Sequence, residues 1–335
     1  MKKKLLVVLL LVSFVFSLGL TGCQKADEPK KGDGGQAPAA KYPEKDITLI
    51  IPFTAGGASD VQARIVEKYF KDEFGVNLII TYKEGAGGEV GFTELAKSNP
   101  DGYTIGGLNV PHIVLQPLAR ETEFTIDSFA YIGQVVNDPQ LVAVLKDSKY
   151  NSLQELIDDA KANPGKITLG NVGTFSGHHI ASLNLMDLTG TEFTLIPYKG
   201  SADQIVALQG GHVNAIMGNL NDVMRDLDKY KILGIATEER HPMVPDVPSF
   251  KELGVDMSSG ITRLFGAPKD IAPEKLARLR EGFEKIAKNP QYLEDMAKIG
   301  QPEEWKTGDK VYEDLKKEVE TAKSLLEKYD LLDKK

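Results

Sequence analysis

Three glycine-rich segments hold the residue types that could bind a ligand or do chemistry. The first, Pro52–Asp60, places Gly56 and Gly57 between an apolar run and a helical pattern. Adjacent glycines let backbone N–H groups turn toward one point, and a helix start adds about half a positive charge there. The segment is therefore either an anion cradle or a tight turn that needs glycine. It lacks the Lys-Ser/Thr ending of a P-loop, which argues against nucleotide hydrolysis.

The second segment, Glu84–Gly91, has the look of a dinucleotide-binding turn. The spacing G-x-G-x-x-G from Gly85 would require glycine at position 90, where the chain has Val90. An acidic residue for the ribose, expected about twenty residues further on, is also missing. We therefore expect a second turn rich in backbone amides, with no nicotinamide and no other cofactor.

The third segment, Gly170–His179, combines a serine with two histidines. Ser176 stands in Gly-x-x-Ser-Gly, whereas a nucleophile elbow requires G-x-S-x-G. His178 and His179 would point about 100° apart on a helix, and no H-E-x-x-H pattern is present, so we expect no metal site. The segment favours hydroxyl and amide donors at a helix start, which suits a carboxylate ligand. An enzyme that uses Ser176 or His178 is the alternative.

The elements that position these segments alternate along the chain. We expect strands over 46–53, 77–82, 103–108, 141–145, 167–171, 191–196, 212–217 and 231–236. We expect helices over 61–74, 152–162, 273–288, 291–299 and 309–326, with Asp60 as the N-cap of the first. Such βα units predict an α/β fold with mostly parallel sheets, helices on both faces and two lobes. Ligands of such sheets sit beyond the carboxyl ends of the strands.

The N-terminus has the features of a secretory signal peptide. Lys2–Lys4 precede an apolar run over 5–20, which is short for a membrane span of ~20 residues. The run ends in Leu20-Thr21-Gly22-Cys23, which resembles a bacterial lipobox with Cys23 as the lipidation site. We expect a signal peptide over 1–22 and a flexible tether over 23–41. An ordinary signal peptide or a membrane anchor that contains a cysteine are the alternatives.

The composition limits the class of protein. The chain has 335 residues, of which 41% are hydrophobic and 26% charged, as in soluble globular proteins. A formal net charge of −8 argues against binding to nucleic acid. A single cysteine excludes an intramolecular disulfide and a cysteine-rich zinc site. Both lobes must therefore be stable through their cores alone.

The three segments and several short motifs between them resemble the solute-binding proteins of tripartite tricarboxylate transporters, the TctC/Bug family. The resemblance runs from Tyr42 to about position 286. The motifs occur in the family's order and are Tyr42-Pro43, Pro52-Phe53-x-x-Gly56-Gly57-x-x-Asp60, Gly85-Ala86-Gly87-Gly88, Pro100-Asp101-Gly102-Tyr103-Thr104, Pro197-Tyr198-Lys199-Gly200, Gly210-Gly211 and Pro245-Asp246-Val247-Pro248.

The resemblance implies a two-lobed periplasmic-binding-protein fold with two crossing strands, placed at 141–145 and 264–268. Lobe 1 would comprise 42–142 with 265–335, and lobe 2 would comprise 143–264. It also implies a carboxylate held between the lobes by the glycine segments, and a membrane permease with a large and a small subunit as partner. The residues we assign to ligand binding are Phe53, Thr54, Ala55, Gly56, Gly57, Ser59, Asp60, Gly85, Ala86, Gly87, Gly88, Asn171, Gly173, Thr174, Ser176, His178, Tyr198, Asn219 and Arg263.

Two positions depart from the family's pattern. Asn219 follows Gly218 where many relatives have an acidic residue and then serine, so a ligand amine would lose its carboxylate partner. Arg263 stands near the second crossing, where many relatives have an aromatic residue and then glycine. Arg263 could form a bidentate pair with a ligand carboxylate, or it could be a surface or hinge arginine.

The sequence thus predicts a monomeric, lipid-anchored, extracytoplasmic solute-binding protein without enzymatic activity. Its ligand would be a small carboxylate, with di- and tricarboxylates and aromatic acids all compatible with amide cradles. An extracytoplasmic enzyme on the same scaffold and a ligand sensor for a membrane kinase are the alternatives.

Overall fold

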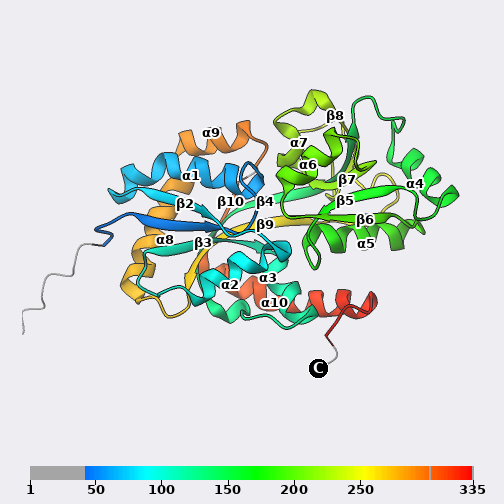
Figure 1. Cartoon of the computed structure of the whole chain (residues 1–335). Coiled ribbons are helices and arrows are strands. Elements are labelled where there is room, and N and C mark those ends of the chain that lie inside the picture. Colours follow the sequence, from blue (N-terminus) through cyan, green and yellow to red (C-terminus); the bar gives the residue numbers. More distant parts are fainter. Residues whose placement is uncertain (1–41, 302, 334–335) are drawn as a thin grey trace, which may run out of the picture. The chain divides into compact units, whose positions relative to one another are not determined.

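The computed structural model describes residues 42–301 and 303–333, which belong to one compact unit (Figure 1). The predicted signal peptide over 1–22, the tether over 23–41 and Cys23 lie outside the described residues. Within the described part, no helix is both long and apolar enough to span a bilayer. The structure therefore concerns the folded body alone.

The first of two sheets is built on strands from both ends of the described chain. Its order is β2 (Leu78–Tyr82), β1 (Ile47–Ile51), β3 (Thr104–Val110), β9 (Gly260–Pro268) and β4 (Phe129–Leu145), with β10 (Glu303–Thr307) also on β4. β1 is parallel to β2 and β3, and its residues Ile47, Leu49 and Ile51 are fully buried. Such a continuous apolar run is typical of a strand that is covered on both faces.

The second sheet shares β4 with the first. The end of β4 lies between β7 (Ala215–Asn219) and β8 (Tyr230–Ile235), and β5 (Thr168–Val172) and β6 (Thr194–Tyr198) follow β7. β5 is parallel to β6 and β7. β4 is antiparallel to all its neighbours, so the expectation of mostly parallel sheets is wrong for the centre of the molecule.

The antiparallel centre follows from how the chain changes sheets. β4 pairs with β9 as far as Pro139, and from Gln140 it pairs with β7. The chain returns at Ser259, whose N–H donates to Ala236 O and whose carbonyl accepts from Gln140 N. Because one strand leaves the first sheet and the other returns to it, the two must run in opposite directions. The sheet change falls at Gln140, one residue before the first predicted crossing segment, and at Gly260, four residues before the second. The lobe boundaries drawn from the sequence stay predictions.

Helices cover both faces of each sheet. Those of the first sheet are α1 (Ala58–Phe74), α2 (Glu89–Lys97), α3 (His112–Ala119), α8 (Pro273–Ala287), α9 (Pro290–Lys298) and α10 (Gly308–Lys328). Those of the second are α4 (Leu153–Ala162), α5 (Gly177–Thr189), α6 (Ser201–Gln209) and α7 (Leu220–Met224). In Figure 1, α1 and α9 lie on one side of the first sheet and α2, α3 and α10 on the other.

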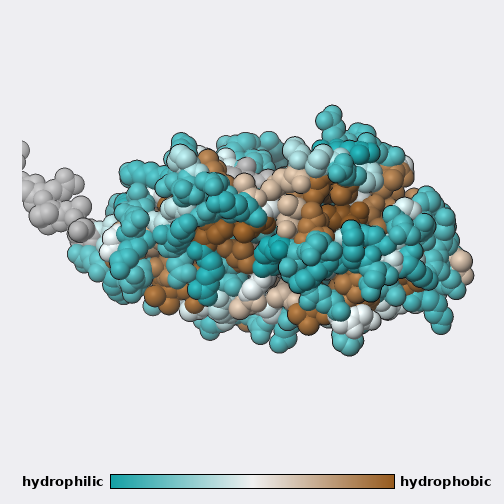
Figure 2. Space-filling view, turned by 90° about the horizontal axis from the view of Figure 1, so that it is seen from above, coloured by the Kyte–Doolittle hydropathy of each residue, from teal (hydrophilic) through white to brown (hydrophobic). Residues whose placement is uncertain are grey.

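Separate buried clusters form the core on the two faces of each sheet. On one face of the first sheet, Phe70 of α1 packs against Phe283 of α8, with ring centroids 6.0 Å apart. Hydrophilic side chains cover most of the surface in Figure 2, with apolar residues exposed between them. These cores hold the strand ends and helix starts that meet at the site.

Candidate functional site

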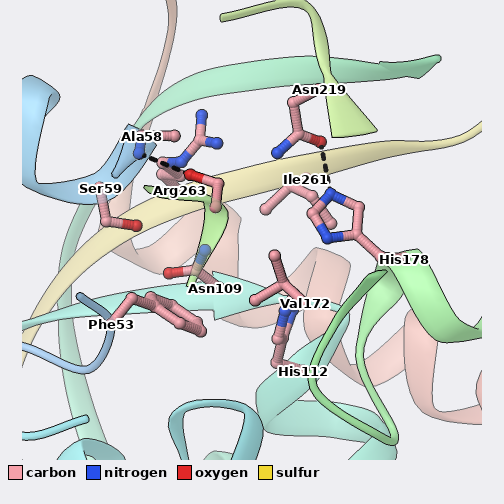
Figure 3. A pocket seen from close by; sticks show the side chains of 11 residues that line it. Phe53, Ala58, Ser59, Asn109, His112, Val172, His178, Asn219, Ile261 and Arg263 are labelled. Atoms are coloured by element: carbon pink, nitrogen blue, oxygen red, sulfur yellow. Dashed lines mark hydrogen bonds between the residues drawn. The ribbon is translucent and has the colours of Figure 1, made fainter. Parts of the chain in front are cut away.

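A pocket lies where the two sheets face each other, beyond the carboxyl ends of β1, β3, β5 and β7. About 300 Å³ of space in and at the mouth of this pocket, open solvent included, is not occupied by protein atoms. The lining residues come from both sheets (Figure 3): Phe53, Ala58, Ser59, Asn109, His112, Val172, His178, Ser201, Asn219, Ile261 and Arg263. This is the position at which α/β sheets bind ligands.

Four helices begin at this pocket. Ala58 and Ser59 open α1, His112 opens α3, His178 is in the first turn of α5, and Ser201 opens α6. The first N–H groups of a helix have no partner within the helix, and the helix dipole places about half a positive charge at this end. Several helix starts around one pocket make a strong anion cradle without a free cationic side chain.

The two sides of the pocket touch each other directly. The N–H of Ala58, at the start of α1, donates to the Oγ atom of Ser201 at a distance of 3.0 Å. Arg225, which follows α7 on the second sheet, donates from Nη1 to the carbonyl of Gly56, also at 3.0 Å. Gly200 lies so close to Thr54 that an added Cβ atom would clash with it. The first glycine segment is therefore in contact with the second sheet.

Arg263 lines the pocket, but its charge already has a partner. Its Nη1 atom is 2.8 Å from Oδ2 of Asp138, and both side chains are almost fully buried. Burial raises the pKa of Asp138 to about 6, against the lowering effect of Arg263. The Nε atom of Arg263 has no protein hydrogen-bond partner in the described residues. Arg263 is thus neither a surface arginine nor a free cation for a carboxylate.

Two buried histidines lie on the pocket wall. Burial lowers the pKa of His112 to about 3, with His178 and Arg263 adding to the effect. Burial also lowers the pKa of His178. The ring of His112 packs edge-on against Phe53, with centroids 5.7 Å apart. Both imidazoles are therefore neutral at pH 7, and neither offers a positive charge to a ligand.

Ser176 is placed as a helix cap. Its Oγ atom accepts from the N–H of His179 at 3.1 Å and donates to the carbonyl of Gly173 at 3.5 Å. The side chain is buried and is not among the residues that line the pocket. Among the described residues no hydrogen bond joins Ser176 to His178, so the geometry of an activated serine is not built here.

The structure brings only some of the predicted ligand-binding residues to the pocket. Phe53, Ser59, His178, Asn219 and Arg263 line it. The others do not, namely Thr54, Ala55, Gly56, Gly57, Asp60, Gly85, Ala86, Gly87, Gly88, Asn171, Gly173, Thr174, Ser176 and Tyr198. Their role in binding stays a prediction, since a ligand can also be reached through the backbone or through water.

Asp60 was expected to cap α1, and this is wrong because Gly57 holds the N-cap position. The Asp60 carboxylate lies in the first turn and accepts from the N–H of Gly56 at 2.7 Å. It also accepts from the hydroxyl of Tyr82 at 2.8 Å. Asp60 therefore stabilises the turn of the first glycine segment through its hydrogen bond to Gly56. A carboxylate in the first turn is as favourable to the helix dipole as one at the N-cap, which is why sequence could not separate the two.

The second and third glycine segments meet each other. A Cβ atom added to Gly173 would lie 2.5 Å from the Cα atom of Gly87, so the backbones are in contact. Gln116 of α3 holds Gly87 by a hydrogen bond of 2.8 Å from Nε2 to its carbonyl. Asn171 supports the other side, donating from Nδ2 to the carbonyl of Gly173 at 2.6 Å.

Six lining residues were not predicted from the sequence: Ala58, Asn109, His112, Val172, Ser201 and Ile261. Ala58 and Val172 are direct neighbours of predicted residues, so they would have been included if every residue of those loops had been assigned to the site. Asn109 and His112 follow the predicted strand over 103–108. The three glycine-rich segments likewise lie directly after a predicted strand. Ser201 follows Pro197–Gly200 at a helix start, which is the signal that could have identified it.

The chain matches the model of the tripartite tricarboxylate transporter family receptor over residues 62–331 and belongs to this family. It is 31% identical over 299 residues to a Cupriavidus necator protein named UPF0065 protein in gbd 5'region, covering 88% of this chain and 91% of the relative. It also resembles the periplasmic binding protein BugD, with 26% identity, a TM-score of 0.83, and coverage of 87% and 99% of the two chains. The fold is that of two-lobed periplasmic binding proteins, and the family is one of solute-binding receptors.

Two further structures share the fold at lower identity. They are Rpa4515 of Rhodopseudomonas palustris with adipate, at 23% identity and a TM-score of 0.81, and MatC (Rpa3494) of the same organism with malate, at 21% and 0.78. Each covers 85% of this chain, and this chain covers 97% and 100% of them. At this identity the likeness concerns the fold alone.

Proposed function

We propose that this protein captures a small carboxylate outside the cytoplasm and delivers it to a tripartite tricarboxylate-type membrane permease. The observation that carries the proposal is the set of four helix starts around one pocket, at Ala58, His112, His178 and Ser201. Helix starts favour an anion, and the described lining residues include no free cation that would attract a larger polyanion. The adipate and malate bound by two proteins of the same fold agree with a carboxylate.

Capture would work by closing the two sides on the ligand. The two sheets are joined by β4 and by the return at Ser259, so the rest of the contact between them can open. In the closed arrangement, Ser201 Oγ accepts from the N–H of Ala58, and the ligand lies among groups from both sides. Closure removes water from the carboxylate and strengthens its interaction with the helix starts. The permease would then recognise the closed form.

A thermal-shift and calorimetry screen would test the proposal. The probes are aliphatic mono-, di- and tricarboxylates and aromatic acids, each paired with its uncharged amide as a control of matched shape. A true ligand at 100 times its Kd should raise the free energy of unfolding by ~2.7 kcal/mol, and its amide should not. A folded protein that no carboxylate stabilises would contradict the proposal.

Lipid anchoring at Cys23 is a separate part of the proposal, and it rests on the order of basic start, apolar run and Leu20-Thr21-Gly22-Cys23. A diacylglyceryl group would supply the two chains that stable anchoring needs. We expect full-length protein expressed in bacteria to be labelled by a palmitate analogue and to sediment with membranes, and Cys23→Ser to lose both properties. A membrane-bound Cys23→Ser protein without label would point to an uncleaved anchor instead.

A further inference from the structure

His178 has a defined proton position in the pocket. Its Nε2 atom lies 3.1 Å from Oδ1 of Asn219, at the end of β7. An amide oxygen can only accept a hydrogen bond, so Nε2 must carry the ring proton. A neutral imidazole has a single N–H, and the burial of His178 keeps it neutral. The other ring nitrogen, Nδ1, is therefore a hydrogen-bond acceptor.

This acceptor is buried and faces the pocket. His178 is 3% exposed and lines the pocket, and its Nδ1 atom has no hydrogen-bond partner among the described protein groups. Figure 3 shows the ring with one nitrogen on Asn219 and the other toward Val172 and the pocket interior. Leaving a buried acceptor unpaired costs free energy, so a ligand that brings a donor to this point gains affinity.

Three kinds of ligand group, which differ in charge, could lie beside Nδ1 of His178. A second carboxylate offers only lone pairs, which would oppose those of Nδ1. An ammonium offers a donor, but its charge would need a carboxylate in the pocket. Neither Asp138, which is paired with Arg263, nor Asp222 lines the pocket. A hydroxyl group offers a donor without a charge. The Nδ1 atom of His112 also lacks a partner among the described residues, but no hydrogen bond to them fixes its tautomer, so it does not decide the ligand.

We propose that the ligand is a hydroxycarboxylate, whose carboxylate lies at the helix starts and whose hydroxyl group donates to Nδ1 of His178. The inference rests on the proposed function and narrows it from any small carboxylate to those with a hydroxyl donor. It makes His178 a residue that determines specificity, with Asn219 positioning its ring through Nε2.

Matched ligand pairs test the inference on the wild-type protein. Propionate and lactate, butyrate and 3-hydroxybutyrate, and succinate and malate each differ by one hydroxyl group, and alanine replaces the hydroxyl of lactate by an ammonium. We expect at least one hydroxylated member to bind about tenfold or more tightly than its partner in calorimetry. Equal affinities in every pair that binds, or a preference for alanine over lactate, would overturn the inference and leave carboxylate binding intact. If no member of any pair, and no other carboxylate, binds, the proposed function itself fails.

A substitution at His178 tests whether its ring causes the preference for the hydroxylated ligand. His178→Leu removes both nitrogens at similar volume, and His241→Leu makes the same change outside the pocket. We expect the affinity ratio within the selective pair to fall to about one in His178→Leu and to stay at the wild-type value in His241→Leu. A merely structural role would lower both affinities equally and leave the ratio unchanged, which would contradict the assignment.

Nitrogen NMR of the wild-type protein gives a readout that needs no variant. In ¹⁵N-histidine-labelled protein, the Nδ1 signal of His178 should show the shift of an unprotonated ring nitrogen, and Nε2 that of a protonated one. The hydroxylated ligand should move the Nδ1 signal in the direction of hydrogen bonding, and its unhydroxylated partner should not. A proton on Nδ1 in the free protein would overturn the inference.

Discussion

The first and second glycine segments look alike in sequence and do different things in the structure. Both follow a strand of the first sheet and precede a helix, and both contain adjacent glycines. The first contains Phe53, Ala58 and Ser59, which line the pocket. The second supplies no lining residue and packs Gly87 against the backbone of Gly173. One segment borders the ligand pocket, and the other closes the contact between the sheets.

The difference shows what glycine does at each place. Gly56 has a φ of +78° with open space around it, so it serves the backbone turn alone. Gly173 has a φ of +68° and also meets Gly87, so it is needed both for the turn and for the close approach. A glycine in a βα turn can thus serve local geometry or a distant partner, and the partner decides which.

The largest expected effect comes from adding one methyl group at each of these glycines. In Gly173→Ala the new Cβ atom meets the Gly87 backbone, and overpacking adds to the cost of a left-handed alanine, for a loss of about 2–4 kcal/mol. In Gly56→Ala only the backbone cost applies, about 1 kcal/mol. Urea unfolding of both variants measures the difference. Equal losses of stability would mean that the contact between the second and third glycine segments contributes nothing.

Acid should weaken the wild-type protein through His112, which packs against Phe53 beside the first segment. Its pKa is about 3 in the folded protein and about 6.5 in the unfolded chain, so below pH 6.5 the unfolded chain takes up a proton that the folded state refuses. As the pH falls below 6.5, stability therefore decreases by up to ~1.4 kcal/mol per unit, or ~2.3 kcal/mol from pH 6.5 to 4.5. His112→Asn should lack this part of the slope in urea titrations, whereas His178, whose pKa is also lowered by burial, keeps its own contribution. Parallel profiles for the two proteins would show that His112 becomes charged in the folded state.

A smaller effect is expected where the first segment touches the second sheet through a side chain. Ser201→Ala leaves the buried N–H of Ala58 without its acceptor, which should cost about 1–2 kcal/mol in urea unfolding. Ser98→Ala is the matched control, because the Ser98 hydroxyl is solvent-exposed and bonds only the carbonyl of Glu94. A Ser201→Ala protein as stable as this control would mean that water replaces the hydroxyl at no cost.

The smallest effect is expected at the rim of the second segment. Arg120 donates from Nη2 to the carbonyl of Ala86 at 2.9 Å and lies over the ring of Phe175, 5.3 Å from its centroid. The side chain is partly exposed, so Arg120→Met should cost only about 0.5–1 kcal/mol in urea unfolding. Arg240→Met, at an exposed ion pair, should cost less. A loss at Arg120 as large as at Gly173 would mean that the rim, rather than the glycine contact, joins the sheets.

The sequence predicted the outer elements of the fold well because their signals are local. The strands over 46–53 and 77–82 and the helix ending at Gly75 all follow from periodicity and a left-handed glycine. It missed the first part of β4, where Gly133, Asn137 and Pro139 are poor strand residues. Pro139 is tolerated because β4 changes partners there. β10 was missed as well, since Glu303–Thr307 is short and polar.

The candidate site was predicted in part for the same reason. Phe53, Ser59 and His178 lie at the end of a strand or the start of a helix, which the sequence marks. Arg263 could not be assigned, because its partner Asp138 lies 125 residues away and nothing in the local sequence links the two. His112 opens α3 directly after β3, and only the folded chain turns its ring toward Phe53.

The sequence by itself determined the family, the alternation of strands and helices, and the helix starts that can hold an anion, because these depend on neighbouring residues. The tertiary structure decided which helix starts share one pocket, which glycines touch across the sheets, and that Arg263 is neutralised by Asp138. It also decided the proton position on His178, through a contact with Asn219, 41 residues away. Contacts of this kind depend on how β4 and β9 bring the two sheets together, and no local pattern encodes that geometry.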